Sequence, residues 1–297
     1  MDLKIWFRET RPNFLLITPL IFSVGLALAY VDGYFDALSA IIGLVGAVLA
    51  HISINVLNDY FDFRSGLDMM TKRTPFSGGS GMLPAGLLRS RDVYLFAVGC
   101  LALDGIIGLY FALLRGWLIL PLVLVSAASI YFYTTHLSRW LVGEIVTGLN
   151  FGPLMVMGSY FIQTGGYSLE ALVSGMVPGI LIGTLLFLNE FPDVAADKEV
   201  GRNNIIIKLG TAKSSRIYAS LIASAYAWIL GAIILGLMPV TAAIVLITLP
   251  IAFRAVKGVL INHQDVGKLI PAMAANVMLD LTAIAAMAIG IFLSVFL

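Results

Sequence analysis

The sequence has few of the residues that hold soluble or secreted domains together. Only 12% of its 297 residues are charged, against about 25% in a typical soluble domain. It contains a single cysteine, Cys100, which excludes an intrachain disulfide framework and a cysteine-based metal site. The net charge is +1, so no excess of positive charge is available for binding nucleic acid. Hydrophobic residues make up 60% of the chain, which predicts that its solvent is a lipid bilayer.

Apolar runs of about 20 residues, long enough to cross a bilayer, recur along the sequence. We predict an all-α membrane protein in which residues 1–297 form one domain with nine transmembrane helices. The segment before the first run lacks a convincing small-residue cleavage site, so we expect a retained first helix and not a signal peptide. The expected helices cover residues 13–31, 37–58, 92–113, 117–134, 141–163, 170–190, 215–237, 239–256 and 270–296. Two long connections remain, residues 59–91 and 191–214, both charged and rich in glycine.

The positive charges are distributed very unevenly between the two sides that nine helices define. Of the 18 Lys and Arg residues, all but Arg115 fall on the side that holds the N-terminus. Cytoplasmic loops carry such an excess of Lys and Arg. We therefore expect a multi-pass protein of the plasma membrane, with the N-terminus and both long loops in the cytoplasm and the C-terminus outside.

The two long loops begin with similar sequences. In each, an Asn precedes an acid, an aromatic residue and an Asp: Asn58-Asp59-Tyr60-Phe61-Asp62 and Asn189-Glu190-Phe191-Pro192-Asp193. A further Asp follows in both, at Asp68 and Asp197. This similarity predicts an internal repeat whose two copies face a common cavity, although so short a match can also arise by chance.

The acids in these loops have the composition of a magnesium site. Neighbouring carboxylates repel each other unless a cation joins them, and oxygen ligands without His or Cys suit Mg²⁺, with Mn²⁺ as a possible replacement. The expected metal ligands are Asp59, Asp62, Asp68, Asp193 and Asp197. The alternative is a pair of solvated acidic loops without a ligand.

Basic residues accompany both acidic clusters, as a diphosphate requires. Arg64, Lys72 and Arg73 follow the first cluster, and Lys198 and Arg202 follow the second. The glycine-rich run of residues 77–81 could surround a phosphate with backbone N–H groups, or it could be only a flexible loop. Some of these cations satisfy the positive-inside rule and need no role in catalysis.

Polar and aromatic residues within the expected helices indicate a cavity. His51, Asn55 and Asn58 follow one face of the second helix, and Asn276 and Asp280 are one turn apart in the last. Such groups usually face a cavity, but hydrogen bonds between helices are the alternative. Asp104 has no evident partner. Tyr131 and Tyr133 could stabilise a carbocation with their ring faces, or belong to an interfacial aromatic belt.

The two motifs resemble the Asp-rich motifs of the UbiA-type intramembrane prenyltransferases, and the resemblance covers nearly the whole chain. The first motif departs from the common pattern, because Gly66 stands four positions after Asp62 and the next acid is Asp68. This spacing is similar to that of the 1,4-dihydroxy-2-naphthoate polyprenyltransferases of menaquinone biosynthesis. The same branch is also similar in sequence at residues 74–81, at Phe151-Gly152-Pro153 and at residues 189–193.

The resemblance implies a helical bundle around a central cavity with a lateral opening to lipid and a cytoplasmic cap formed by the two Asp-rich loops. It implies that Mg²⁺ bridges the Asp motifs and the diphosphate of a polyprenyl donor. Asn58, Asn189, Arg73, Tyr131 and Tyr133 would contact the donor. The departure in spacing leaves open whether Asp59 or Asp68 is a direct ligand. The catalytic group would comprise Asp62, Asp193, Arg64, Lys72, Lys198 and Arg202.

The expected reaction is Mg²⁺-dependent transfer of the polyprenyl group to an aromatic acceptor, 1,4-dihydroxy-2-naphthoate or a related quinone precursor, with release of diphosphate. A carbocation-like species would form in a tunnel that excludes water. One alternative is a prenyltransferase for another acceptor, such as a glycerol phosphate lipid, heme or chlorophyllide. Another is a secondary transporter, whose polar site should lie near the membrane midplane.

Overall fold

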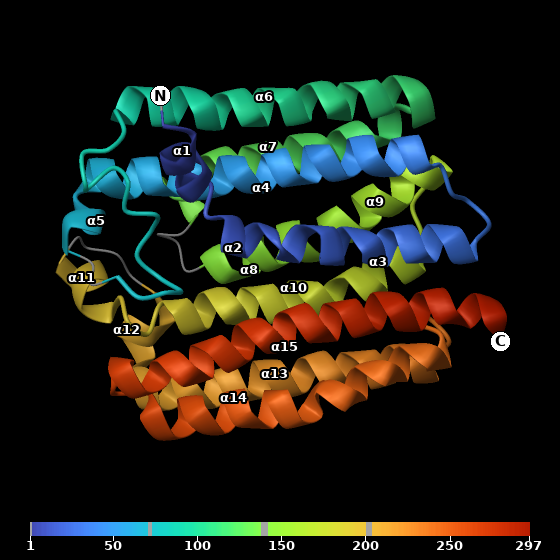
Figure 1. The fold of residues 1–297 in the computed structure, drawn as a ribbon. Coiled ribbons are helices and arrows are strands. Elements are labelled where there is room, and N and C mark those ends of the chain that lie inside the picture. The colour runs from blue at the N-terminus through green and yellow to red at the C-terminus, as the bar shows by residue number, and fades with distance from the viewer. Residues whose placement is uncertain (1, 71–72, 138–141, 200–203) are drawn as a thin grey trace.

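The computed structural model describes residues 2–70, 73–137, 142–199 and 204–297. Within these ranges the chain is helical, with no β-strand, and its long helices lie side by side in one bundle (Figure 1). The long elements are α3 (Ile17–Val31), α4 (Ala37–Ser65), α6 (Ser90–Arg115), α10 (Leu169–Asn189), α13 (Thr211–Ile234), α14 (Leu249–Asn262) and α15 (Val266–Leu293). The short helices are α1 (Leu3–Glu9), α2 (Pro12–Leu15), α5 (Leu67–Met70), α11 (Val194–Glu199) and α12 (Ile205–Leu209).

The prediction of membrane-spanning helices is confirmed for eight of the nine expected segments. Eight helical stretches in the described residues are long and apolar enough to cross a bilayer. The remaining expected segment, 117–134, forms a 3₁₀ turn, η1 (Trp117–Ile119), followed by the shorter α7 (Leu120–Phe132). At about 1.5 Å per residue the 13 residues of α7 span only about 20 Å, less than the ~30 Å hydrocarbon core.

Helix α4 continues beyond its expected end. It begins where Asp36 accepts hydrogen bonds from the backbone N–H groups of Leu38 and Ser39, and it ends at Gly66, whose φ of +81° is a common helix terminator. Residues 59–65, expected in the loop, are therefore the last turns of the helix. Neither Gly nor Pro interrupts them, and the rings of Tyr60 and Phe61 pack beside Tyr94 and Tyr131.

The expected helix over residues 141–163 is divided by a π-helical turn. α8 (Gly143–Leu149) leads into η3 (Asn150–Leu154), which contains Pro153, and then into α9 (Met155–Thr164). Proline lacks the N–H that a regular helix would use, and a π turn accommodates this loss. At Gly148 the backbone of α8 approaches α10 so closely that a Cβ atom would lie 2.6 Å from the carbonyl oxygen of Gly179.

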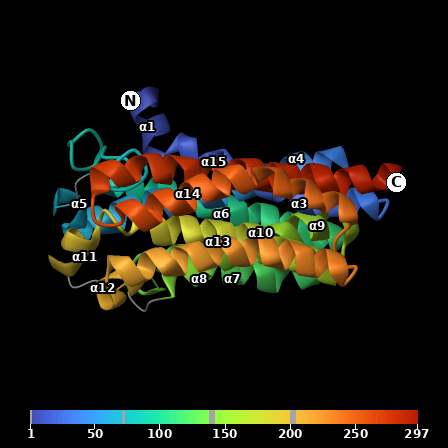
Figure 2. The ribbon, with the colours of Figure 1, turned by 90° about the horizontal axis from the view of Figure 1, so that it is seen from below.

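The ends of the bundle differ in what they carry. The N-terminus and the short helices α1, α5, α11 and α12 gather at one end, and the C-terminus lies at the other (Figures 1 and 2). At the C-terminal end, Arg115 forms an ion pair with Asp36 at 3.2 Å and donates to the carbonyl oxygen of Ile162 at 2.9 Å. We call the other end, where α5 and α11 lie, the motif end.

The first half of the expected segment 239–256 also departs from a regular helix. Residues Val240–Thr248 form a 3₁₀ helix, η4, and α14 follows to Asn262. The long loop expected over residues 191–214 contains α11, α12 and the first turn of α13. Helix α15 packs against α3, α10, α14 and η4, so the last helix is held on several sides.

Candidate active site

The first acidic motif occupies the end of α4 and the start of α5. The Asn58 amide Nδ2 donates to Asp62 Oδ2 at 3.0 Å, one helical turn later, and to Thr134 Oγ1 at 3.2 Å. Because both contacts fix the amide, Asn58 orients the Asp62 carboxylate. The side chains of Asp59, Asp62 and Asp68 are all buried.

Asp59 is held by the glycine-rich loop and by an arginine from the N-terminal segment. The backbone N–H of Ser80 donates to Asp59 Oδ2 at 2.7 Å, and Arg11 Nη1 lies 3.8 Å from Asp59 Oδ1. Arg11 itself has a left-handed backbone, with φ of +56°, a conformation that costs energy for a residue with a Cβ atom. In this structure the N–H group of Ser80, which we expected to be available for a phosphate, is thus used by an acid of the motif.

Glu9, at the end of α1, joins the same cluster. Its side chain is fully buried, and Ser80 Oγ donates to its Oε2 atom at 2.6 Å. Burial and the negative charge of Asp59 raise the pKa of Glu9 to about 7, against the smaller opposing effects of Ser80 and Arg11. The N-terminal helix therefore adds a further titratable group beside the first motif.

Asp68 lies in α5, close to Asp59. A Cβ atom on Gly79 would be 3.1 Å from Asp59 Oδ1 and 3.4 Å from Asp68 Oδ1, so both carboxylates flank this glycine. Burial, followed by the charges of Asp59 and Asp62, raises the pKa of Asp68 to about 8. Without a bound cation, Asp68 therefore keeps its proton at neutral pH.

The second motif follows the end of α10. Asn189 is the last residue of that helix, and the backbone N–H of Asp197 donates to the carbonyl oxygen of Asp193 at 2.9 Å in the turn that starts α11. The Asp197 side chain is buried, and Asn204 Nδ2 donates to its Oδ2 atom at 3.0 Å. Asn204 also caps α12 by accepting from the backbone N–H of Ile207 at 2.8 Å.

The two motifs lie at the same end of the bundle. Helix α5, which carries Asp68, packs against α11, which carries Asp197, and both views show these helices together (Figures 1 and 2). Asn58 and Asn189, the first residues of the two motifs, line one cavity between α4, α8, α10 and α15. The leading asparagines of the two sequence patterns therefore line a common cavity, whereas none of the five expected metal ligands is among the residues that line it.

The cavity extends from these asparagines toward the middle of the bundle. We call this part the polar chamber; its walls include Arg11, His51, Asn55, Thr147 and Asp280. His51 Nδ1 is 2.6 Å from Thr18 Oγ1, and Asn55 Nδ2 donates to the carbonyl oxygen of Thr10 at 3.1 Å. The sequence left open whether such residues face a cavity or form hydrogen bonds between helices. His51 and Asn55 do both, because each bonds a neighbouring segment and also lines the cavity.

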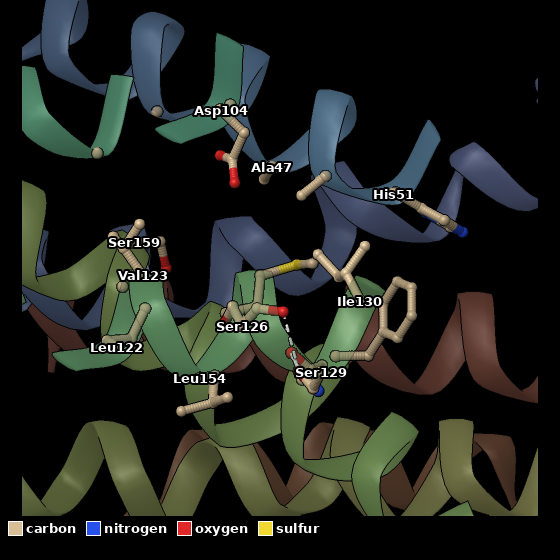
Figure 3. Close-up of a pocket in the computed structure, with 18 of the residues that line it drawn as sticks. Ala47, His51, Asp104, Leu122, Val123, Ser126, Ser129, Ile130, Leu154 and Ser159 are labelled. Carbon is tan, nitrogen blue, oxygen red and sulfur yellow. Dashed lines mark hydrogen bonds between the residues drawn. The ribbon is translucent and has the colours of Figure 1, made fainter. Parts of the chain in front are cut away.

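A second, mostly apolar cavity adjoins the polar chamber, and we call it the apolar chamber. The two share wall residues, among them His51, Ile54, Tyr133 and Phe151. The apolar chamber lies between α4, α6, α7 and α9, and the small residues Gly43, Gly46 and Ala47 of α4 are among the residues that line it. Figure 3 shows the carboxyl group of Asp104 pointing into it from α6, opposite Ser126 and Leu122 of α7.

The expected cations occupy different positions around the motifs. Arg64 is exposed and lines a surface groove together with Asp62 and Thr135, and Lys198 is exposed on α11. The guanidinium group of Arg73 covers Gly81, where a side chain would collide with it. Lys72 and Arg202 lie outside the described residues.

The two expected aromatic residues are placed differently. Tyr133 lines both chambers. Tyr131 is not among the residues that line them, and its hydroxyl lies 3.0 Å from that of Tyr94, in a cluster with Phe61. A role beside a carbocation is thus supported for Tyr133 alone.

The donor set at the motif end fits a hard divalent cation that the substrate helps to coordinate. In the described residues, no three Asp, Glu, His or Cys side chains converge closely enough to hold a metal by themselves. However, the buried atoms Asp59 Oδ1 and Asn189 Oδ1 make no hydrogen bond, which is unusual for buried oxygens. Mg²⁺ is typically bound by one or two carboxylates together with substrate phosphates.

Several residues of this region were missed by sequence reasoning. Glu9 and Thr134 contact a motif residue or its immediate partner from a distant part of the chain, and Asn204 contacts Asp197 from seven residues later. Asn204 carries a readable signal, because an Asn before an apolar helix is a typical N-cap. Glu9 and Thr134 carry none, since their contacts depend on the tertiary structure.

Comparison with known proteins identifies relatives over most of the chain. The model of the UbiA prenyltransferase family matches residues 17–277. The 1,4-dihydroxy-2-naphthoate octaprenyltransferase of Bacillus subtilis is 27% identical over 276 residues, covering 90% of this chain and 86% of that protein. A UbiA homolog from Aeropyrum pernix has a similar fold, with a TM-score of 0.73 at 16% identity over 93% of this chain and 97% of the other. A UbiA homolog from Archaeoglobus fulgidus, solved with GPP and Mg²⁺, has a TM-score of 0.60 at 15% identity over 95% and 99% of the two chains.

Proposed function

We propose a specific reaction from the premise that this chain belongs to the UbiA prenyltransferase family. It is an enzyme that transfers a prenyl group from a prenyl diphosphate to an acceptor, and the alternative of a secondary transporter falls away. The acceptor we propose is an aromatic compound, 1,4-dihydroxy-2-naphthoate or a related quinone precursor, and the donor is a polyprenyl diphosphate. The observation that carries this proposal is the common cavity lined by Asn58 and Asn189, which continues into an apolar chamber.

The diphosphate of the donor would bind at the motif end. Asp62 and Asp193, with Asp59, Asp68 and Asp197, would hold Mg²⁺, which on binding would neutralise negative charge on the diphosphate. Asp59 and Asn189 each offer a buried oxygen without a hydrogen bond. Asn58 keeps the Asp62 carboxylate in place through its 3.0 Å hydrogen bond, and Asn204 does the same for Asp197.

Basic side chains would assist departure of the diphosphate. Arg64, Arg73 and Lys198 lie on the same end as the motifs, and Lys72 and Arg202 belong to the same proposed group by their sequence positions. Arg11 is an additional candidate, because it lines the polar chamber and lies 3.8 Å from Asp59. A positive charge beside the leaving oxygens stabilises the charge that develops as the C–O bond breaks.

The hydrocarbon tail would occupy the apolar chamber. Its wall is made mainly of apolar side chains from α4, α6, α7 and α9, and such a wall excludes the water that would capture a carbocation. Tyr133 and Phe151 line the junction of the two chambers, where an aromatic face can stabilise a positive charge without reacting with it.

The aromatic acceptor is proposed on two grounds. The relatives in Bacillus subtilis and Escherichia coli are named 1,4-dihydroxy-2-naphthoate octaprenyltransferases, at 27% and 28% identity. The spacing from Asp62 to Asp68 resembles the spacing found in the same group of enzymes. By that resemblance, formation of the new carbon–carbon bond accompanies loss of the carboxylate of the acceptor.

The motif end would face the cytoplasm of a plasma membrane. Arg115 lies at the opposite end, paired with Asp36, and the other Lys and Arg residues fall on the motif side by the predicted topology. This orientation places diphosphate and Mg²⁺ on the side where the cell supplies them.

A transfer assay on the full chain in liposomes tests the proposal. Wild-type protein should convert geranyl diphosphate and 1,4-dihydroxy-2-naphthoate in a Mg²⁺-dependent reaction, whereas Asp62→Ala and Asp193→Ala should each lose activity by about 100-fold or more. Asp92→Ala is the matched control, because Asp92 is exposed in the first turn of α6. Retained Mg²⁺-dependent activity in both motif variants would refute the site. A panel with glycerol phosphate lipid, heme and chlorophyllide precursors would show whether another acceptor is preferred.

A further inference from the structure

A chain of buried polar side chains crosses the bundle from α13 to the polar chamber. Tyr218 Oη donates to Asn276 Oδ1 at 2.6 Å, and Asn276 Nδ2 donates to Asp280 Oδ2 at 2.9 Å. Tyr218 and Asn276 are fully buried, and Asp280 is 1% exposed. These hydrogen bonds run in one direction, so each residue orients the next and Asp280 stands at the end.

The second oxygen of Asp280 is left for a ligand. Asp280 Oδ1 is buried and makes no hydrogen bond, although Asp280 belongs to the wall of the polar chamber together with its neighbours Val277 and Leu281. A buried polar atom without a partner is costly and rare. Asp280 Oδ1 is such an atom, and it belongs to a residue in the cavity wall at the end of an ordered hydrogen-bond chain. This position points to a partner that enters the cavity.

The chemistry of the oxygen limits what that partner can be. Asn276 already donates to Asp280 Oδ2, so Oδ1 is the oxygen left for a ligand, and an ionised carboxylate there would accept from a ligand O–H or N–H group. A prenyl diphosphate offers neither, because its tail is hydrocarbon and its head is anionic. Among the other polar residues of the chamber, His51 contacts Thr18 and Asn55 donates to Thr10, whereas Asn189 Oδ1 also lacks a hydrogen bond but lies at the motif end.

We propose that Asp280 binds the prenyl acceptor, and that its Oδ1 atom accepts a hydrogen bond from an aromatic hydroxyl group. Asn276 and Tyr218 are positioning residues that hold the carboxylate in this orientation. The inference rests on the proposed function, because it requires a hydroxylated aromatic acceptor in the polar chamber. That chamber is also lined by Asn58 and Asn189, so an acceptor bound there lies between Asp280 and the diphosphate site.

The same contact would favour the reaction. A carboxylate that accepts a hydrogen bond from a ring hydroxyl increases the electron density of the ring, and an electron-rich ring attacks a carbocation-like centre more readily. The contact would also make the enzyme selective among acceptors, because a site that accepts a hydrogen bond from a hydroxyl group discriminates against an analogue without that hydroxyl.

Steady-state kinetics of Asp280→Asn in liposomes test the inference. The amide of this variant can still accept from Asn276 and would present an N–H group to the chamber in place of an oxygen. We expect the KM for 1,4-dihydroxy-2-naphthoate to rise by about tenfold or more, while the KM for geranyl diphosphate stays at the wild-type value. The wild-type enzyme should prefer the dihydroxy acceptor to one of its two monomethyl ethers, and this preference should disappear in the variant.

A second pair of variants guards against misfolding of Asp280→Asn. Tyr218→Phe removes the first donor of the chain, whereas Tyr226→Phe removes a buried hydroxyl from the same helix that bonds Thr248 at 2.6 Å. Only Tyr218→Phe should raise the acceptor KM. An unchanged acceptor KM and an unchanged preference in Asp280→Asn, or equal acceptor KM values in the two tyrosine variants, would overturn the inference. Absence of transfer to any hydroxylated aromatic by the wild-type enzyme would instead refute the proposed function.

Discussion

Asn204 donates a hydrogen bond of 3.0 Å to Asp197, seven residues earlier in the chain, and at the same time caps helix α12. One side chain thus holds both a proposed metal ligand and the start of the next helix. Its two roles use different atoms, Nδ2 for the acid and Oδ1 for the cap, so substitutions can separate them.

Asn204→Asp should therefore be more harmful to magnesium binding than to folding. The new carboxylate can still cap α12, but it replaces a donor with a negative charge beside Asp197. Loss of such an orienting partner typically costs about tenfold or more in metal affinity. The measurement is the Mg²⁺ concentration at half-maximal activity, with Asn204→Ala as the variant that loses both roles. Equal Mg²⁺ requirements in wild type and Asn204→Asp would contradict the orienting role of Asn204.

Gly79 provides a test of the first motif with an internal control. Gly79 and Gly86 share a φ of +69°, but a Cβ atom at Gly79 meets the carboxylates of Asp59 and Asp68, whereas one at Gly86 meets nothing within 4 Å. Gly79→Ala and Gly86→Ala should both lose about 1–2 kcal/mol of stability to backbone strain. Only Gly79→Ala should raise the Mg²⁺ requirement, because only there does a methyl group push against the two acids. A similar Mg²⁺ requirement in both variants would show that the position of Gly79 beside the acids is unimportant.

The titration of Asp68 predicts how stability depends on pH. Its pKa is raised from the ordinary value of 3.8 to about 8 in the folded protein, so between these values the folded state holds a proton that the unfolded state has released. The metal-free protein should therefore lose stability as the pH rises through this window. Thermal unfolding in detergent should show a falling Tm, and Asp68→Asn should flatten the dependence, leaving the smaller contribution of Glu9.

Magnesium should reverse this trend. A cation competes with the proton for Asp68, so apparent Mg²⁺ affinity should increase with pH up to about 8. A Tm of the metal-free wild type that rises over the same range would show that Asp68 is already ionised without metal.

The apolar chamber should limit the length of the donor tail. Ala47 lines this chamber (Figure 3), and Ala47→Phe would fill part of it. Activity with octaprenyl diphosphate should fall by about tenfold or more, while activity with the shorter geranyl diphosphate is largely kept. Ala102→Phe on the exposed surface of α6 is the matched control. Equal losses with both donors would indicate general damage to the bundle and would argue against a tail-binding chamber.

The positions of the helices and of the two motifs could be predicted because they follow from local sequence. Apolar runs define the spans, and the Asn-acid-aromatic-Asp pattern marks the ends of α4 and α10. The end of α4 could not be predicted, because apolar residues give way to charged ones at Asp59 whereas the helix continues to Ser65. Charged residues can continue a helix when their neighbours pack, as Tyr60 and Phe61 do here.

The supporting residues of the site could not be predicted because their partners are distant in sequence. Glu9 contacts Ser80, which is 71 residues later in the chain, and Thr134 contacts Asn58 from the segment after α7. The pairing of Asn276 with Asp280 was readable from their spacing, but its continuation to Tyr218 was not. Spacing along one helix can be read directly, whereas contacts between helices require the packing of the whole bundle.

The contact of α5 with α11 joins the two halves of the chain, each of which carries one of the two acidic motifs. Residues up to α7 would contribute one set of acids, and residues from α8 onward the other, so neither fragment alone contains a complete binding surface for diphosphate. Either piece produced by itself should be inert, whereas the two produced together could reassociate in one bilayer, since each consists of apolar helices that insert independently. In this sense the proposed diphosphate site would be an interface between two halves of a single polypeptide.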